Sequence, residues 1–170
     1  VRRLASGTFE IIAGERRSTR APSEGLRTLY QSPTLTIEGT ERIAVLREGK
    51  ADAQVFLAGE IVAERDPSQI QMRAVRRPAQ LAEAILRSSP EQWRERYEGR
   101  YLLVAVSPDG TCRIGADRFG QMDLYLQEVD GHVVLATDMD LLPMARGSAT
   151  YDQLALAHAL CVYGFRPPKQ

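Results

Sequence analysis

The residue types that most often carry chemistry are sparse in this chain of 170 residues. Its two cysteines, Cys112 and Cys161, lie far apart, with no CxxC pair and no histidine beside either of them. This spacing favours neither a disulfide framework nor a zinc site, and we expect both cysteines to be small core or edge residues. His132 follows an Asp-Gly turn and His158 lies in a helix-like segment, without a second ligand at metal-binding spacing. The sequence therefore predicts no metal site.

A polar turn between apolar residues is the most informative segment of the chain. Residues 115–125 read GADRFGQMDLY, and residues 130–138 read DGHVVLATD. Apolar residues flank the pair Asp117 and Arg118, and Gly120 can adopt a positive φ. The pattern predicts a strand, a polar turn, a second strand, a tight Asp-Gly turn and a third strand.

Composition argues against several classes of function. Lys+Arg and Asp+Glu both number 22, so no net charge favours nucleic acid, a membrane surface or an acidic partner. Basic pairs at 2–3, 16–17 and 76–77 are not interleaved with aromatic residues, which indicates a solvated surface. No apolar run is long enough to cross a bilayer, and no signal-peptide core is visible at the start. We expect a single cytoplasmic domain.

The elements that must position these residues alternate between strands and a few helices. Residues 16–32 carry Ser, Pro, Gly and Arg without periodicity, which predicts a loop. Helices are predicted by apolar spacing and capping residues at 78–86, 89–93 and 151–160. Strands are predicted by alternation or apolar runs at 8–13, 34–38, 42–46, 54–62, 101–106 and 111–114. Hairpin succession with few helices indicates an α+β fold with antiparallel sheets.

Four segments resemble, in order, the amidotransferase domain that opens asparagine synthetases and their relatives. LAGEI at 57–61 resembles its NGEIYN segment, QLAEAIL at 80–86 its SDTEVIL segment, and EGRYLLVAV at 98–106 its LxGxFAFALWD segment. Residues 115–138 resemble its ARDRFGxxPLYY and DGxxFASE segments, and VYGFRPP at 162–168 resembles the GYVPPP at its end. The resemblance implies a four-layer αββα sandwich of the N-terminal-nucleophile hydrolase type. It implies one domain over 1–165, and the start of a linker at 166–170.

The resemblance also implies a degenerate site. In the family an N-terminal cysteine attacks the glutamine amide with its own α-amine as base. An Asn side chain and a Gly amide form the oxyanion hole, and an Asp holds the substrate's α-amino group. Here these positions read Val1 for the cysteine, Ala58 for the Asn and Leu81 for the Asp, while Gly59 and Glu60 remain. Since one oxyanion donor contributes about 10²–10³ in rate, the losses favour an inactive glutaminase.

The remaining motif residues are predicted to have a structural role. In the family the pair corresponding to Asp117 and Arg118 lies on the sheet and loop framework, so we expect a structural salt bridge, with Gly120 in the turn. No catalytic residue is then expected in this chain.

The leading hypothesis is a scaffold for a PP-loop synthetase domain, in the same polypeptide or a separate chain. β-Lactam synthetases and lasso-peptide cyclases resemble this pattern, because they lack the cysteine and form amide bonds by ATP-dependent adenylation. The synthetase signature SGGxDS is absent from these residues, so ATP and Mg are expected in the partner. A homo-oligomer is left open.

Two alternatives remain. Alignment of the family's CGIFG strand with residues 8–12 makes Thr8 a candidate N-terminal nucleophile, if cleavage after Gly7 freed its amine. The chain would then be an active glutamine-hydrolysing domain. Alternatively, Ala58 and Leu81 reshape the former glutamine pocket into an apolar site of a stand-alone binding module.

Overall fold

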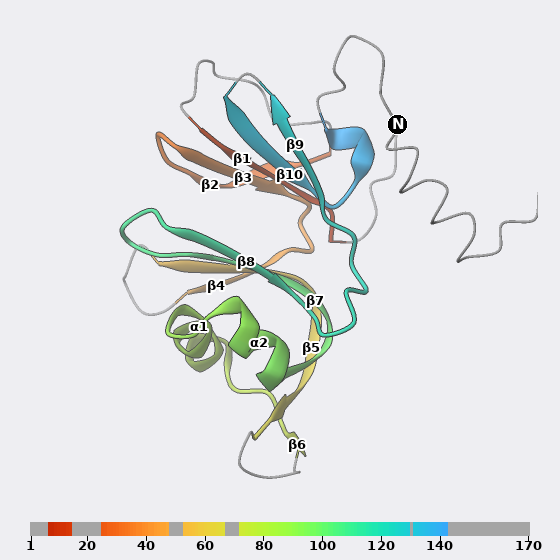
Figure 1. The fold of residues 1–170 in the computed structure, drawn as a ribbon. Helices are drawn as coiled ribbons and strands as arrows, with labels where there is room; N and C mark the ends of the chain where they lie inside the picture. Colours follow the sequence, from red (N-terminus) through yellow and green to blue (C-terminus); the bar gives the residue numbers. More distant parts are fainter. Residues whose placement is uncertain (1–6, 15–24, 48–52, 67–71, 130, 143–170) are drawn as a thin grey trace, which may run out of the picture.

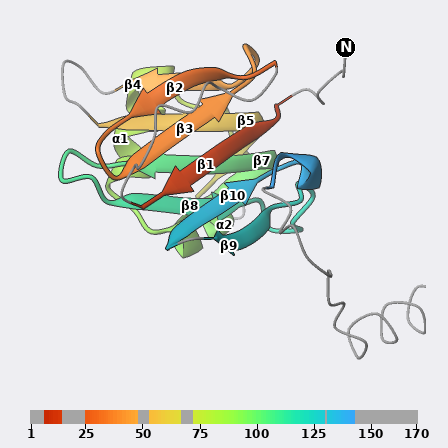
Figure 2. The same cartoon turned by 90° about the horizontal axis from the view of Figure 1, so that it is seen from above.

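Two antiparallel sheets face each other, and two helices cover the outer face of one of them (Figure 1). The computed structural model describes residues 7–14, 25–47, 53–66, 72–129 and 131–142. Seen from above, the strands of one sheet cross those of the other at an angle (Figure 2). The described part therefore has a sheet, sheet and helix order of layers, which confirms a mixed α+β fold with antiparallel sheets.

Sheet A has the strand order β2-β3-β1-β10-β9. Its central strand β1 pairs antiparallel with both β3 and β10, so the first described strand lies at the middle of the sheet. The strands span β1 Phe9–Ala13, β2 Arg27–Gln31, β3 Leu35–Gly39, β9 Tyr125–Val129 and β10 His132–Ala136.

Sheet B has the order β4-β5-β7-β8, and the short strand β6 pairs with the end of β5. Its two long central strands, β5 and β7, are paired antiparallel over most of their length. The strands span β4 Ala44–Arg47, β5 Gln54–Arg65, β6 Met72–Arg73, β7 Tyr97–Val106 and β8 Cys112–Ala116. The helices are α1 Pro78–Leu86, α2 Pro90–Arg96 and the 3-10 turn η1 Met139–Leu141.

Strand β5 divides its side chains between two apolar cores, as alternation in a strand requires. Val55 and Leu57 pack with the helices in a core on the outer side of sheet B. Phe56 and Ala58 pack in the core between the two sheets, together with Phe9 of sheet A. Sheet B is therefore buried on both faces, which explains the continuous apolar sequence of its central strands.

The two predicted helices with clear signals are confirmed. Helix α1 has the predicted bounds, with Pro78 in the first turn, where its missing N–H costs nothing. Helix α2 begins after Ser89, whose hydroxyl accepts from the Gln92 amide while the Gln92 side chain accepts from the Ser89 amide. This reciprocal capping fixes the start of a seven-residue helix that would otherwise be marginal.

The loop predicted at 16–32 is wrong in its last part, because β2 occupies Arg27–Gln31. This strand lies at the edge of sheet A, is largely exposed, and shifts register between Thr28 and Tyr30. Edge exposure and an irregular register remove the apolar alternation by which a strand is recognised in sequence. The predicted helix at 151–160 and the domain boundary at 165 lie outside the described residues. Among the described helices, none has the length and apolar character to cross a bilayer.

Candidate functional site

The segment 115–125 links the two sheets. Strand β8 belongs to sheet B and β9 to sheet A, so residues 117–124 carry the chain from one sheet to the other at their edge (Figure 1). Asp117 is 2% exposed, and its carboxylate accepts hydrogen bonds from the amides of Phe119 (2.9 Å) and Gln121 (3.2 Å). Its own amide donates to the Tyr101 carbonyl oxygen at 3.0 Å. Asp117 thereby fixes the conformation of this crossing loop.

The expected salt bridge between Asp117 and Arg118 is absent from the ion pairs of the described residues. The Asp117 carboxylate is turned into its own loop and bonded to backbone amides, while Arg118 is exposed. Gly120 has φ +59° and closes this turn, as the sequence predicts. The motif is therefore structural, but an aspartate-centred turn replaces the ion pair.

The crossing loop brings Met122 against the start of β1 and the middle of β5. A Cβ placed on Gly7 would lie 3.7 Å from the Ala58 Cβ, 3.7 Å from the Gly59 nitrogen and 4.0 Å from the Met122 Cε. Residues from three distant parts of the chain thus meet at one point, which we call the convergence site (Gly7, Ala58, Gly59 and Met122). Two of the predicted pocket residues lie here, beside the residue that precedes Thr8.

Two glycines allow the strands β5 and β7 to approach closely beside the convergence site. Gly59 has φ +83°, and a Cβ there would lie 2.1 Å from the Arg100 carbonyl oxygen. Across the pair, Gly99 has φ +148°, and a Cβ would lie 2.2 Å from the Glu60 carbonyl oxygen. Only glycine fits either position. Glu60 itself is exposed and lies opposite Arg100 in the strand register.

The convergence site offers little chemistry from side chains. Ala58 is fully buried in the core between the sheets and has no hydrogen-bond donor in its side chain. Thr8 is 2% exposed, and its carbonyl oxygen accepts from the Thr40 amide at 3.1 Å. The backbone of Phe9 exchanges hydrogen bonds with Thr137, which anchors β1 to the end of β10. In the intact chain Thr8 is therefore a buried residue of the framework.

Leu81 does not lie at the convergence site. It is 4% exposed in α1 and packs in the core between the helices and sheet B, with Leu57 and Ile61. Ala58 lies on the opposite face of the same sheet, in the core between the sheets. The apolar pocket expected from Ala58 and Leu81 together is therefore not formed by these two residues.

The remaining candidate residues stand apart from one another. Cys112 is a half-buried free thiol on β8, and burial raises its pKa to about 11. His132 is half-buried at the start of β10, and its ring lies against Gly14 at the end of β1. Among the described residues no three potential ligands are close enough to hold a metal ion. His158 and Cys161 lie outside the described residues.

A second cluster, which no sequence pattern predicted, lies on the helix side of sheet B. Glu64, near the end of β5, is 6% exposed. Its two carboxylate oxygens accept from the Nε atoms of Arg76 (2.9 Å) and Arg96 (2.5 Å). The pair at 76–77 was expected to be a solvated surface. Only the fold brings Arg76 to Arg96, since the whole of α1 and all of α2 before its last residue separate them in the sequence.

Comparison with known proteins adds no further assignment. We found no matching protein-family model, no matching curated protein and no matching solved structure. Any function must therefore be argued from the residues and the geometry described above.

Proposed function

We propose that this chain is a degenerate amidotransferase-like domain that serves as a non-catalytic scaffold for an ATP-dependent, amide-forming synthetase domain. One observation carries the proposal: Gly7, Ala58 and Gly59 converge where the residue before the central strand β1 of one sheet meets the central strand β5 of the other. An active glutaminase of this type needs a nucleophile and a side-chain oxyanion donor there. The position of the donor is occupied by the buried methyl group of Ala58.

The arrangement of layers supports the same proposal. A four-layer αββα sandwich needs helices on the outer faces of both sheets, and α1 and α2 cover sheet B. On the outward face of sheet A, Ala136 is fully buried and packs with Leu26 and Leu141. Apolar packing thus continues beyond the second sheet, as a fourth layer requires.

The scaffold role assigns adenylation to a partner. In the proposed assembly, a PP-loop synthetase domain binds ATP and Mg, activates a carboxylate and forms the amide. The present chain packs against that domain and positions it without supplying ammonia. β-Lactam synthetases and lasso-peptide cyclases are the proposed functional analogues.

Two measurements test this proposal. The purified chain is expected to release no ammonia from glutamine above the level of the Thr8→Ala variant, since none of the described residues of the convergence site carries a nucleophile. Co-expression with its cognate synthetase domain is expected to give a stable complex and raise ATP–pyrophosphate exchange by that domain. Exchange that is unchanged by the chain, together with failure to co-purify, would contradict the scaffold role.

The active-hydrolase alternative rests on one specific observation. Gly7 lies beside the nitrogen of Gly59, the glycine that the resemblance assigns to the oxyanion hole. Thr8 follows Gly7 directly in the chain. Cleavage after Gly7 would create an α-amine next to the threonine hydroxyl, which is the arrangement that activates such a nucleophile. Intact-mass measurement of the protein produced in cells decides this. A mass that begins at Thr8, with ammonia release lost in Thr8→Ala, would establish the alternative and overturn the scaffold proposal.

A further inference from the structure

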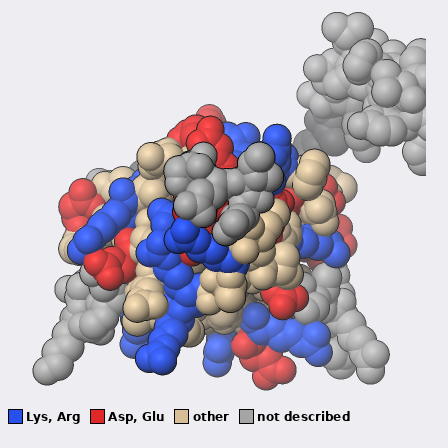
Figure 3. All heavy atoms as spheres, turned by 90° about the horizontal axis from the view of Figure 1, so that it is seen from below, with Lys and Arg blue, Asp and Glu red and all other residues tan. Residues whose placement is uncertain are grey.

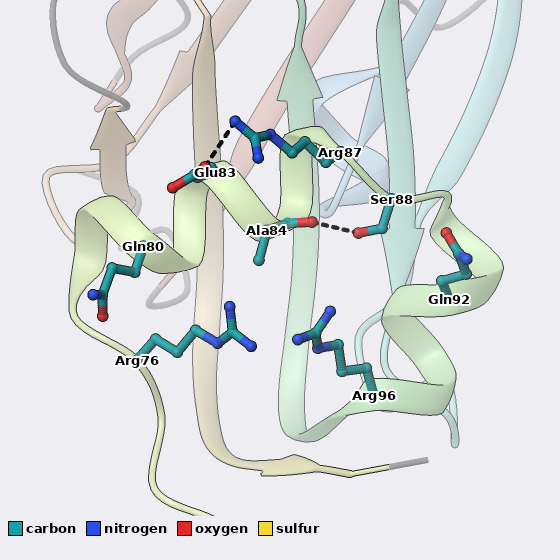
Figure 4. Close-up of a pocket in the computed structure, with 8 residues that line it drawn as sticks. All are labelled: Arg76, Gln80, Glu83, Ala84, Arg87, Ser88, Gln92 and Arg96. Carbon is teal, nitrogen blue, oxygen red and sulfur yellow. Dashed lines mark hydrogen bonds and ion pairs between the residues drawn. The ribbon is translucent and has the colours of Figure 1, made fainter. Parts of the chain in front are cut away.

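A polar groove lies between α1 and α2, on the side of sheet B that faces away from the convergence site (Figure 4). Its volume is about 600 Å³, within the ~300–1,000 Å³ of typical small-molecule sites. Both helices and the segment that enters α1 contribute to its walls. The lining residues are Arg76, Gln80, Glu83, Ala84, Arg87, Ser88, Gln92 and Arg96.

The groove carries an excess of positive charge. Glu64 neutralises one unit of charge, yet it is bonded by two guanidinium groups, those of Arg76 and Arg96. At the other end, Arg87 pairs with Glu83 at 2.8 Å within α1, so that pair adds no net charge. Basic side chains also gather in the middle of the molecular face at the β6 end, with acidic ones mostly around them (Figure 3). Counted over the described lining residues and Glu64, the groove therefore has one more basic than acidic side chain.

Arg76 and Arg96 both bind Glu64 through a single nitrogen, which leaves their terminal Nη atoms available as donors. Both bind Glu64 through Nε, and their Nη atoms make no hydrogen bond within the described ranges. Figure 4 shows the guanidinium groups of Arg76 and Arg96 converging in the space between the helices. Glu64 lies behind them, 6% exposed, so the buried carboxylate orients both groups. Such preorganised forks are suited to an anion with several acceptor oxygens.

The neighbouring tyrosine adds a second observation. Tyr97 lies opposite Glu64 in the register of β5 and β7, and the Arg96 guanidinium lies 6.0 Å from the centre of its ring. Its hydroxyl is buried and has no hydrogen-bond partner in the described part of the chain. Tyr97 belongs to the apolar core between the helices and sheet B, and its ring lies against the Arg96 guanidinium from that side.

We propose that this groove binds a phosphate-bearing small molecule, with Arg76 and Arg96 holding the phosphate. A phosphate monoester supplies up to two negative charges and three terminal oxygens, which suits two converging forks better than a single carboxylate. Gln80 and Gln92 then line the path of the organic part. This site lies on the opposite face of sheet B from the convergence site and does not depend on the scaffold proposal.

Titration of the whole chain tests the proposal directly. Inorganic phosphate, ribose 5-phosphate and acetate are added at equal ionic strength, and the Nε–H signals of Arg76 and Arg96 are followed by NMR. We expect saturable shifts with both phosphates and at least ~10-fold weaker binding of acetate. Shifts that do not saturate, or that acetate reproduces at equal concentration, would overturn it. Saturation by phosphate without any by ribose 5-phosphate would also overturn it, since the groove would then exclude the organic part.

Matched variants locate the site. Arg76→Gln removes one fork while Arg96 still compensates Glu64, so the fold is expected to persist; Arg96→Gln is the reciprocal variant. Arg27→Gln makes the same change of charge on an exposed residue of sheet A. We expect phosphate affinity to fall at least ~10-fold in either groove variant and to be unchanged in Arg27→Gln. Equal affinity in all folded variants would refute the assignment.

Discussion

Arg113 of strand β8 lies over the indole ring of Trp93 in helix α2, with its guanidinium carbon 5.9 Å from the ring centre. The same guanidinium donates to the carbonyl oxygens of Leu86 (2.6 Å) and Ser88 (2.7 Å), at the end of α1. The indole N–H donates to Ile85 and Ser88. One arginine thus joins the end of one helix, the centre of the next and the last strand of sheet B.

Removal of that arginine side chain is expected to destabilise the fold. Arg113→Ala loses two charge-assisted hydrogen bonds and the contact with Trp93, so we expect the free energy of unfolding to fall by about 2–4 kcal/mol. Arg113→Lys is expected to recover only part of this loss, because an ammonium group cannot reproduce the planar fork. Urea unfolding followed by Trp93 fluorescence measures both variants. The exposed Arg118→Ala is the control, expected within ~0.5 kcal/mol of the wild type.

Two glycines with the same φ separate steric contact from backbone strain. Gly59 and Gly110 both have φ +83°, but a Cβ on Gly110 would meet nothing within 4 Å. Gly110→Ala is therefore expected to cost about 1–2 kcal/mol, the strain of a left-handed residue. Gly59→Ala must also displace the Arg100 carbonyl, and we expect a loss of more than ~4 kcal/mol. Equal losses in urea unfolding would mean that β5 and β7 are not closely apposed there.

Restoring the missing donor is not expected to restore a glutaminase. Ala58→Asn places an amide in the core between the sheets, where it overpacks and lacks partners, so we expect a loss of about 2–5 kcal/mol. Under the proposed scaffold function no ammonia should be released from glutamine, because Ala58→Asn supplies no nucleophile. Ala44→Asn on the exposed side of β4 is the matched control, expected to be nearly neutral. Unchanged stability of Ala58→Asn would show that Ala58 faces open space.

The burial of the Cys112 thiol can be tested by measuring its pKa and the pH dependence of stability. Burial raises its pKa from 9.0 to about 11, so the folded chain keeps the thiol proton where the unfolded chain has released it. Between these two pH values, the unfolded state binds fewer protons, and stability therefore falls as pH rises. Alkylation of Cys112, quantified in its own peptide, should show an inflection near 11 in the folded chain. Cys112→Ser is expected to lose stability less steeply over the same range; a folded-state inflection near 9 would contradict burial.

Local signals account for the elements that the sequence predicted well. Pro78 and the N-cap Ser89 mark helix starts through contacts within one turn, and both are found as expected; the reciprocal bond to the Gln92 side chain is added by the structure. The central strands β5 and β7 of sheet B were predictable because two buried faces require a long apolar run. Strand β2 was missed because its edge position and register shift leave no alternation to detect.

The candidate sites depended on contacts that no local pattern encodes. The sequence alone determined most of the strands, though not β2 or β6, together with the turn around Asp117 and the absence of a donor at Ala58. It did not determine that Ala58 and Leu81 face opposite sides of sheet B, since the resemblance aligns residues without assigning their faces. Nor did it place Arg76 beside Arg96, because only the packing of α1 and α2 on sheet B brings both to Glu64. Spacing along the chain fixes which face a side chain takes within its own element, whereas tertiary packing decides what lies against that face.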